Sequence, residues 1–147
     1  MKPAARKLGA ELLVENVAMR PGKPVWFARH PAFCILGLPG NPASALVCSH
    51  LFLRPLLDRW SGREGAAPFI RARLATPLPA NGPREHYLRA RLSSDDDGRV
   101  AVAPFESQDS ARLTVFQNAD ALIRLPPRAA AQAAGALVDV LALDRLR

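Results

Sequence analysis

A proline- and glycine-rich turn lies between an apolar run and a helical pattern, and this junction constrains the fold more than any other segment. Residues 33–38 are almost wholly apolar, which predicts a fully buried strand. Pro39 and Gly40 supply a tight turn, because proline fixes φ and glycine tolerates positive φ. Asn41 is a favoured helix N-cap, and Pro42 is pre-organised for the first helical position. The junction therefore predicts a strand–turn–helix unit of an α/β fold.

The start of that helix is a candidate anion site. We expect the backbone N–H groups of Ala43 and Ser44 to be free there, at an end that carries a partial positive charge. Ligands of open α/β sheets also bind at the carboxyl ends of strands. A well-capped junction without any ligand explains these residues equally well.

A second Pro/Gly turn precedes the strand, at residues 19–24, and it carries two cations. Arg20 and Lys23 have the chemistry to hold a phosphate or another oxyanion, and arginine does so in a bidentate manner. A solvated surface turn is the alternative for this segment, and on these residues alone it is preferred.

Two parts follow from the change in composition near residues 61–68, where small residues, two glycines and a proline indicate a linker. Residues 1–62 form the α/β part, with a further strand at 25–29 and a helix over 42–60 that Pro55 should kink or split. Leu8, Leu12 and Leu13 predict a short helix near the N-terminus, followed by a strand between Val14 and Met19.

Residues 63–147 have an all-β pattern that predicts a small barrel or sandwich. A hairpin loop is expected at residues 95–98, and a turn at Gly135 just before the last strand. The expected strands are 69–74, 86–92, 99–104, 120–125 and 136–143.

Charge and composition narrow the class of protein. The net charge is +7, and residues 1–62 hold most of it, with eight basic against three acidic side chains. This field favours an anionic partner. Nucleic acid is not expected, because the aromatic residues are not interleaved with the basic ones. No apolar run approaches the roughly 20 residues of a membrane span, and no secretory signal is evident. Two cysteines make neither a disulfide scaffold nor a four-ligand zinc site, so we expect a reduced, cytoplasmic protein.

The two turns, taken in order with the later segments, resemble one enzyme family. The R-P-G-K-P turn at 20–24, a strand and then L-P-G-N-P-A-S-A at 38–45 are similar to the molybdopterin molybdenumtransferases, namely MoeA and the E domain of gephyrin. The resemblance covers residues 14–147. Further segments that carry it are 51–57, 87–90, 107–110, 118–122 and 125–126.

The resemblance implies the C-terminal part of a MogA-like α/β domain, followed by a small β-barrel domain. It implies molybdenum cofactor biosynthesis: insertion of molybdate into adenylylated molybdopterin (molybdopterin-AMP), with Mg²⁺ and with release of AMP. By position, Pro39 and Pro42 match loop prolines that shape the active site, and Arg89 and Ser110 match polar positions that face it. Arg20 takes the place of a family basic residue just before the Pro-Gly turn. Together with the two turns, the candidate substrate-binding residues are Arg20, Lys23, Gly37, Gly40, Asn41, Ala43 and Ser44.

Two departures from the family qualify this assignment. Asn16 stands where many members carry a second basic residue, and the chain is much shorter than the family's. We therefore expect the Mg²⁺ ligands to lie in the missing N-terminal part, and we take the acids at 95–97 as a solvated hairpin. The chain alone should show no turnover, and it should form a homodimer or pair with the missing domains.

Two other classes remain open: a non-catalytic interaction or dimerisation module, and an anion- or nucleotide-binding fragment. Three histidines, at positions 30, 50 and 86, show no ligand spacing. Cys34 is expected to be buried in a strand and Cys48 in the helix core, and neither has the partner pattern of a nucleophile.

Overall fold

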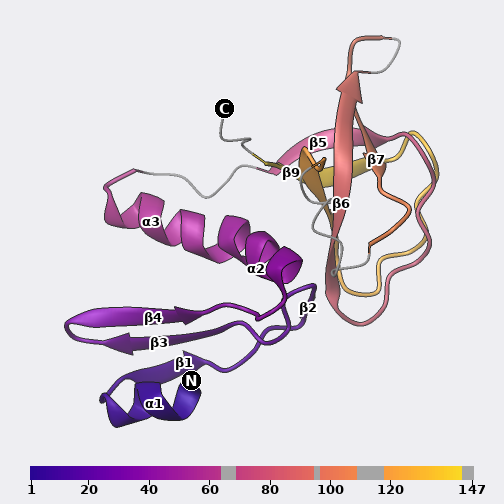
Figure 1. The fold of residues 1–147 in the computed structure, drawn as a ribbon. Helices are drawn as coiled ribbons and strands as arrows, with labels where there is room; N and C mark the ends of the chain where they lie inside the picture. Colours follow the sequence, from indigo (N-terminus) through magenta and orange to yellow (C-terminus); the bar gives the residue numbers. More distant parts are fainter. Residues whose placement is uncertain (64–68, 95–96, 109–117, 144–147) are drawn as a thin grey trace.

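The computed structural model describes residues 1–63, 69–94, 97–108 and 118–143, and it has two parts (Figure 1). Residues 1–60 form a small α/β part, and the strands from Phe69 onward form a β-barrel. The expected fold class, a partial α/β domain followed by a small barrel, is confirmed. No helix in the described ranges is long and apolar enough to cross a membrane.

The α/β part consists of a three-stranded antiparallel sheet with a helical segment along one face (Figure 1). The strand order is β1-β3-β4, so β3 is central. The elements are α1 (Lys2–Lys7), β1 (Glu11–Val14), β3 (Trp26–His30), β4 (Phe33–Gly37), α2 (Pro42–Cys48), the π-helical turn η1 (Ser49–Leu53) and α3 (Arg54–Trp60).

The helical segment breaks where the sequence predicts it. The α-helical pattern stops at Cys48, and the π-helical turn carries the chain to Arg54. Pro55 then lies in the first turn of α3, directly after the π-helical turn, and its missing N–H cannot continue the i→i−4 bonding pattern. The expectation that Pro55 kinks or splits the helix is therefore confirmed.

The strand at 33–37 is less buried than its apolar sequence suggests. It was expected to be fully buried, but β4 is an edge strand, hydrogen-bonded to β3 alone among the described strands. Phe33 is 38% exposed, and Cys34 is only half-buried. Both expectations were wrong because a sequence run does not reveal whether neighbours cover its two faces.

The N-terminal elements begin earlier than expected. The helix occupies residues 2–7, and Leu12 and Leu13 belong to strand β1 instead. Gly9 sets this boundary: its φ of +78° ends the helix, and the N–H of Ala10 bonds back to the carbonyl of Ala5. The expected strand from Val14 to Met19 is replaced by a loop between β1 and the two-residue strand β2 (Met19–Arg20).

Five strands of the second part close into a ring. Its order is β6-β7-β5-β9-β8, and pairing of β8 with β6 completes it. The core inside the ring is aliphatic, with Val102, Ile123 and Val140 fully buried. Gly135, at φ +83°, makes the turn before the last strand as expected. The strands are β5 (Phe69–Leu74), β6 (Glu85–Ser94), β7 (Val100–Pro104), β8 (Ala121–Leu125) and β9 (Leu137–Ala142).

The two parts pack against each other through a shared hydrophobic core. Val47 and Cys48 of α2 pack against Leu122 and Leu141, which point outward from the barrel on β8 and β9. Successive strand residues face opposite sides, so Ile123 fills the barrel while its neighbour Leu122 fills the junction. This junction places the second Pro/Gly turn against the barrel wall.

Candidate functional site

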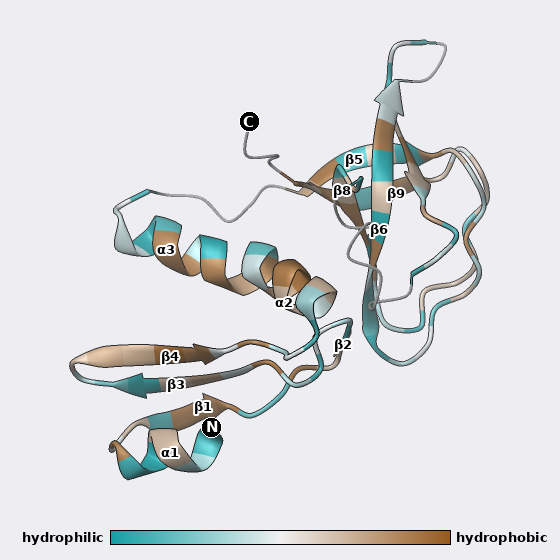
Figure 2. Ribbon diagram, in the orientation of Figure 1, coloured by the Kyte–Doolittle hydropathy of each residue, from teal (hydrophilic) through white to brown (hydrophobic). Residues whose placement is uncertain are grey.

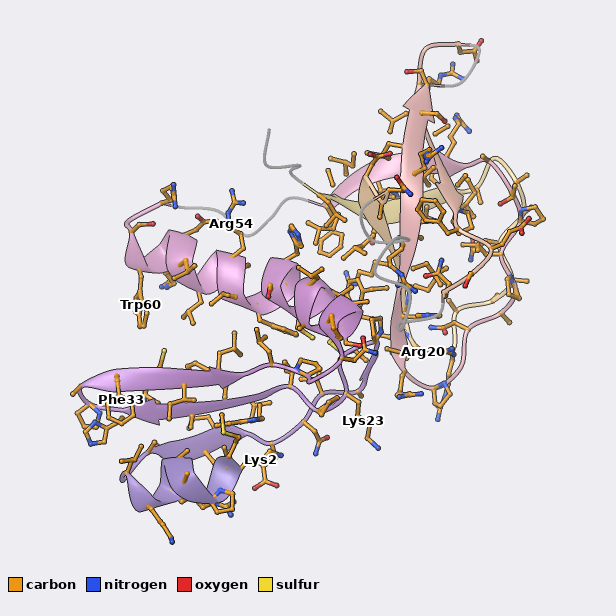
Figure 3. All side chains as sticks on the ribbon, viewed as in Figure 1. Lys2, Arg20, Lys23, Phe33, Arg54 and Trp60 are labelled. Carbon is orange, nitrogen blue, oxygen red and sulfur yellow. The ribbon has the colours of Figure 1, made fainter. Side chains whose placement is uncertain are left out.

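The turn at residues 21–24 is held between α2 and the barrel. Strand β2 pairs in parallel with the start of β6, and this pairing sets Arg20 beside His86. Gly22 adopts a φ of +114°, and a Cβ atom there would lie 2.6 Å from Sγ of Cys48. Only glycine combines this φ with so close an approach to the helix. Figure 3 shows Arg20 next to the start of β6, between the two parts of the molecule.

The start of α2 supplies a second wall. Asn41 caps the helix: its Oδ1 accepts hydrogen bonds from the backbone N–H of Ser44 at 3.1 Å and from the Ser44 hydroxyl at 3.3 Å. The N–H of Ser44 was expected to be free. It is not, because it donates to the Asn41 cap. Ala43 and Ser44 are both buried, and they face the turn that carries Arg20 and Lys23.

The third wall is the first half of β6. Arg89 is only 3% exposed, so the surface ion pair that its sequence context allowed is ruled out. Gln108 hydrogen-bonds to it: the Gln108 Oε1 accepts from the backbone N–H of Arg89 at 3.0 Å and from its side-chain Nε at 3.5 Å. The Gln108 amide group donates in turn to the Arg89 carbonyl at 3.0 Å. Two of these bonds hold the backbone of Arg89, and the long contact at Nε is the one that reaches its guanidinium.

These walls enclose a cavity of about 410 Å³, here named the junction cavity. Four cationic side chains from both parts of the molecule meet in it, and no carboxylate is among its described lining residues. Charges of one sign in a low-dielectric cleft focus the field and attract anions. The four cations are Arg20 and Lys23 from the α/β part and Arg84 and Arg89 from the barrel.

The environment shifts two titratable groups in this cavity. The pKa of His86 is lowered from 6.5 to about 4, first by burial and then by the charges of Arg20, Arg84 and Arg89. The pKa of Tyr87 is raised to about 12, chiefly by burial. At neutral pH the cavity therefore holds a neutral imidazole and a neutral phenol among four positive charges.

The structure brings together five of the residues that the sequence singled out: Arg20, Lys23, Ala43, Ser44 and Arg89 line the junction cavity. Ser110 lies outside the described residues. Sequence reasoning missed Arg84, His86, Tyr87 and Gln108 as parts of the site, because only the pairing of β2 with β6 reveals them.

The remaining predicted residues shape the strand–helix turn and do not line the cavity. They are Gly37, Pro39, Gly40, Asn41 and Pro42. Gly37 ends β4 directly over an indole: a Cβ atom there would lie 1.8 Å from Nε1 of Trp26. Glycine at this position is explained by packing, not by contact with a ligand.

The described residues do not fit a Mg²⁺ site. They contain no group of three or more His, Cys, Asp or Glu side chains able to hold a metal ion. Mg²⁺ prefers carboxylate oxygens and water in an octahedral arrangement, and the junction cavity offers cations instead.

Comparisons with known proteins agree with this geometry. Residues 1–59 match the family described as a probable molybdopterin binding domain, and residues 71–143 match the MoeA C-terminal region, domain IV. A molybdopterin molybdenumtransferase of Bacillus subtilis is 32% identical over 136 residues, which are 92% of this chain and 31% of the relative. One from Nostoc is 36% identical over 124 residues, 81% of this chain and 28% of the relative.

A solved structure matches both parts at once. The crystal structure titled as the molybdopterin biosynthesis MoeA protein from Pyrococcus horikosii aligns with a TM-score of 0.77 and 28% identity, over 95% of this chain and 34% of that one. The chain thus joins an α/β region of the family described as a probable molybdopterin binding domain to a MoeA-type barrel. The chain belongs to the MoeA family and corresponds to its C-terminal portion. It spans about a third of the length of the curated relatives it matches.

Proposed function

We propose that this chain acts in molybdenum cofactor biosynthesis, as the part of a molybdopterin molybdenumtransferase that holds the anions. The reaction is the insertion of molybdate into adenylylated molybdopterin with release of AMP. The observation that supports the proposal is the junction cavity, where four cations from two parts of the fold surround a space of about 410 Å³. Both molybdate and the phosphate of the adenylate are anions that such a cavity favours.

In this proposal Arg89 is the central oxoanion ligand. Its guanidinium is buried, which strengthens each hydrogen bond to a charged oxygen, and Gln108 holds the backbone from which the side chain extends. Arg20 and Lys23 hold the anion from the opposite wall. Ser110 remains a second proposed oxoanion ligand. The turn residues Gly37, Pro39, Gly40, Asn41 and Pro42 keep Ala43 and Ser44 in place.

Molybdate binding tests the proposal directly. The purified chain should bind molybdate in a calorimetric titration at low salt, and more weakly at high salt because the charges are screened. Arg89→Ala should weaken binding by at least about tenfold, since it removes a buried charge-assisted donor.

A charge-matched control separates this site from general basicity. Arg71→Ala removes the same charge from a side chain that is 61% exposed and paired with Asp139 on the outside of the barrel. We expect it to change molybdate affinity by less than about twofold. Equal losses in the two variants, with circular dichroism showing both folded, would contradict the proposal.

The enzymatic step needs its own experiment. The chain alone, with adenylylated molybdopterin, molybdate and Mg²⁺, is expected to release no AMP, because the described residues offer no Mg²⁺ site. We propose that the Mg²⁺ ligands come from family regions outside the matched portion. A Bacillus subtilis relative in which this chain replaces the matched segment should release AMP, and Arg89→Ala should abolish that release. An Arg89→Ala chimera with full activity would refute the role of Arg89.

A partner is also part of the proposal, either a second copy of this chain or the family regions outside the matched portion. An apolar groove of about 410 Å³ runs between the sheet and the helical segment of the α/β part. Brown apolar segments face each other across it in Figure 2. Val17, Leu36, Phe52 and Leu56 are among its lining residues. Sedimentation should show self-association of the isolated chain; a monomer at every concentration would exclude the homodimer.

A further inference from the structure

His86 lies on the wall between two cavities. It is near the start of β6, beside Arg20 of β2 and opposite Leu125 of β8. On one side it lines the junction cavity. On the other it lines a second cavity of about 450 Å³ at the end of the barrel, which is mainly apolar and includes Leu78, Leu88 and Phe105. Among the described residues, His86 and Gln108 are the two that line both spaces.

The charges around His86 come from every element that packs near it. Arg20 faces it from β2, Lys23 from the following turn, Arg84 from the bend just before β6, and Arg89 from β6 itself. Among the described lining residues of the barrel-end cavity, Glu106 is a carboxylate. The neighbouring Glu85 is already paired with Arg124. The balance is strongly positive, so an imidazolium is disfavoured while the junction cavity is empty of anions.

An anion reverses this balance. Two negative charges placed among four cations cancel much of the field that opposes a fifth. An imidazolium in the same cavity then gains a charge-assisted hydrogen bond to the anion. Partial burial of His86 and full burial of Arg89 strengthen both terms, whereas Arg20, Lys23 and Arg84 are exposed to water and contribute more weakly.

We propose that His86 is the proton-uptake residue of the junction cavity: it is neutral in the empty cavity and becomes a cationic donor when a dianionic oxoanion is bound. The inference rests on the proposed function, since it places the anion in this cavity. Binding of the oxoanion therefore takes up a proton from solution. His86 thus favours dianions over monoanions.

The sign of the pH dependence follows from linkage. The complex holds more protons than the free protein, so falling pH favours the complex. This gain begins as the pH falls through the His86 pKa of the complex, and it ends near pH 4, where the free protein is protonated as well. One proton gives at most about a tenfold change in affinity per pH unit.

Sulfate is the probe, because it stays a dianion throughout this range. Calorimetric titrations of the full chain at pH 7.5 and pH 5, each in two buffers of different ionisation enthalpy, measure affinity and proton uptake together. We expect sulfate to bind about three- to tenfold more tightly at pH 5 than at pH 7.5, with uptake of a fraction of one proton. His86→Asn, which keeps a neutral polar side chain, should bind with the same affinity at both pH values.

Two variants serve as controls. Glu106→Gln removes the carboxylate of the barrel-end cavity and should keep the pH slope. His30→Asn removes an imidazole that stacks on Phe33 at the β3–β4 turn, far along the sheet from the junction, and it should keep the slope too (Figure 3 labels Phe33). Circular dichroism at both pH values verifies that each variant is folded.

The outcomes separate the two proposals. Sulfate binding without proton uptake, or an unchanged slope in His86→Asn, would overturn the role of His86 and leave the anion site standing. A slope lost in Glu106→Gln alone would transfer proton uptake to that carboxylate and also overturn it. No sulfate binding by the wild-type chain at either pH would overturn both the anion site and the inference.

Discussion

The barrel and the α/β part of this chain solve the problem of burying apolar surface in different ways. The barrel closes its strands into a ring, and its fully buried residues face one another across the interior. The α/β part leaves its edge strand and helical segment half covered: Leu57 is 45% exposed and Trp60 is 66% exposed. Its best-buried helix residues, Val47 and Cys48, belong to the core shared with the barrel. The α/β part therefore relies on the core that it shares with the barrel, beside a smaller core of its own that contains Trp26 and Ala28.

The largest expected effect tests this contrast in the cores. Ile123→Ala should lower the free energy of unfolding by about 3–4 kcal/mol, because it removes a fully buried side chain and leaves a cavity in the barrel. Leu57→Ala, in the half-covered helix α3, should cost less than about 1 kcal/mol. Urea denaturation followed by circular dichroism measures both. Similar losses would mean that the α/β part is as well packed as the barrel.

The next effect concerns the turn that joins the parts. Gly22→Ala should destabilise the chain by about 2–3 kcal/mol, because it strains a φ of +114° and drives a methyl group into Cys48. It should also weaken molybdate binding, since Arg20 and Lys23 flank this turn. The measurements are urea denaturation and calorimetry.

Gly62→Ala is the matched control for that variant. Gly62 has a φ of +71° with nothing within 4 Å of an added Cβ atom, so it carries the backbone strain without the clash. We expect a loss of about 1 kcal/mol and normal molybdate binding. Equal losses of molybdate affinity in Gly22→Ala and Gly62→Ala would show that the turn at residues 21–24 does not form part of the binding site.

A smaller effect appears when the pH is lowered without any anion. The pKa of His86 is about 4 in the folded chain and near 6.5 when unfolded, so the unfolded chain binds the proton first. Stability should therefore fall between pH 6.5 and pH 4. Because the imidazole is partly open to water, we expect a loss of about 1–2 kcal/mol. In His86→Asn the decline over this window should be shallower by that amount; an identical decline would place the responsible group elsewhere.

The smallest effects compare one ion pair in each part. Glu85→Gln weakens the pair with Arg124, whose side chains are 24% and 39% exposed, and should cost about 1 kcal/mol. Glu15→Gln acts on a pair with Arg6 that is about 60% exposed on both sides, and should cost less than about 0.5 kcal/mol. Thermal unfolding at low and high salt measures the difference; the reverse order would contradict the idea that the barrel buries its polar groups better.

Local features of this fold were predictable from the sequence. The Asn41 cap and the break before Pro55 depend on a few neighbouring residues, and both are confirmed. The five barrel strands were located to within two residues, because alternation with period two and turn residues are local signals. The burial of β4 was not predictable, since it depends on which strand occupies the centre of the sheet.

In the candidate site too, the sequence predicted local features better than those that depend on contacts between distant segments. Arg20 and Arg89 were identified through the resemblance, whereas Arg84, His86 and Gln108 were not. His86 joins the site because two residues of β2 pair with two residues of β6, which are far apart in the sequence. The expectation of a free N–H at Ser44 was wrong for a local reason. The Asn41 cap accepts the hydrogen bond from the donor that an anion would need.

The pairing of β2 with β6 makes the junction cavity a composite, with two cations contributed by each side. If the cavity binds the proposed anion, a cut or hinge motion along the β2–β6 pairing would separate Arg20 and Lys23 from Arg84 and Arg89 and weaken the field on that anion. Engineers who split or permute this chain must therefore keep residues 19–24 joined to the barrel. A solute or polypeptide that separates β2 from β6 would then release the proposed anion without binding to the same residues.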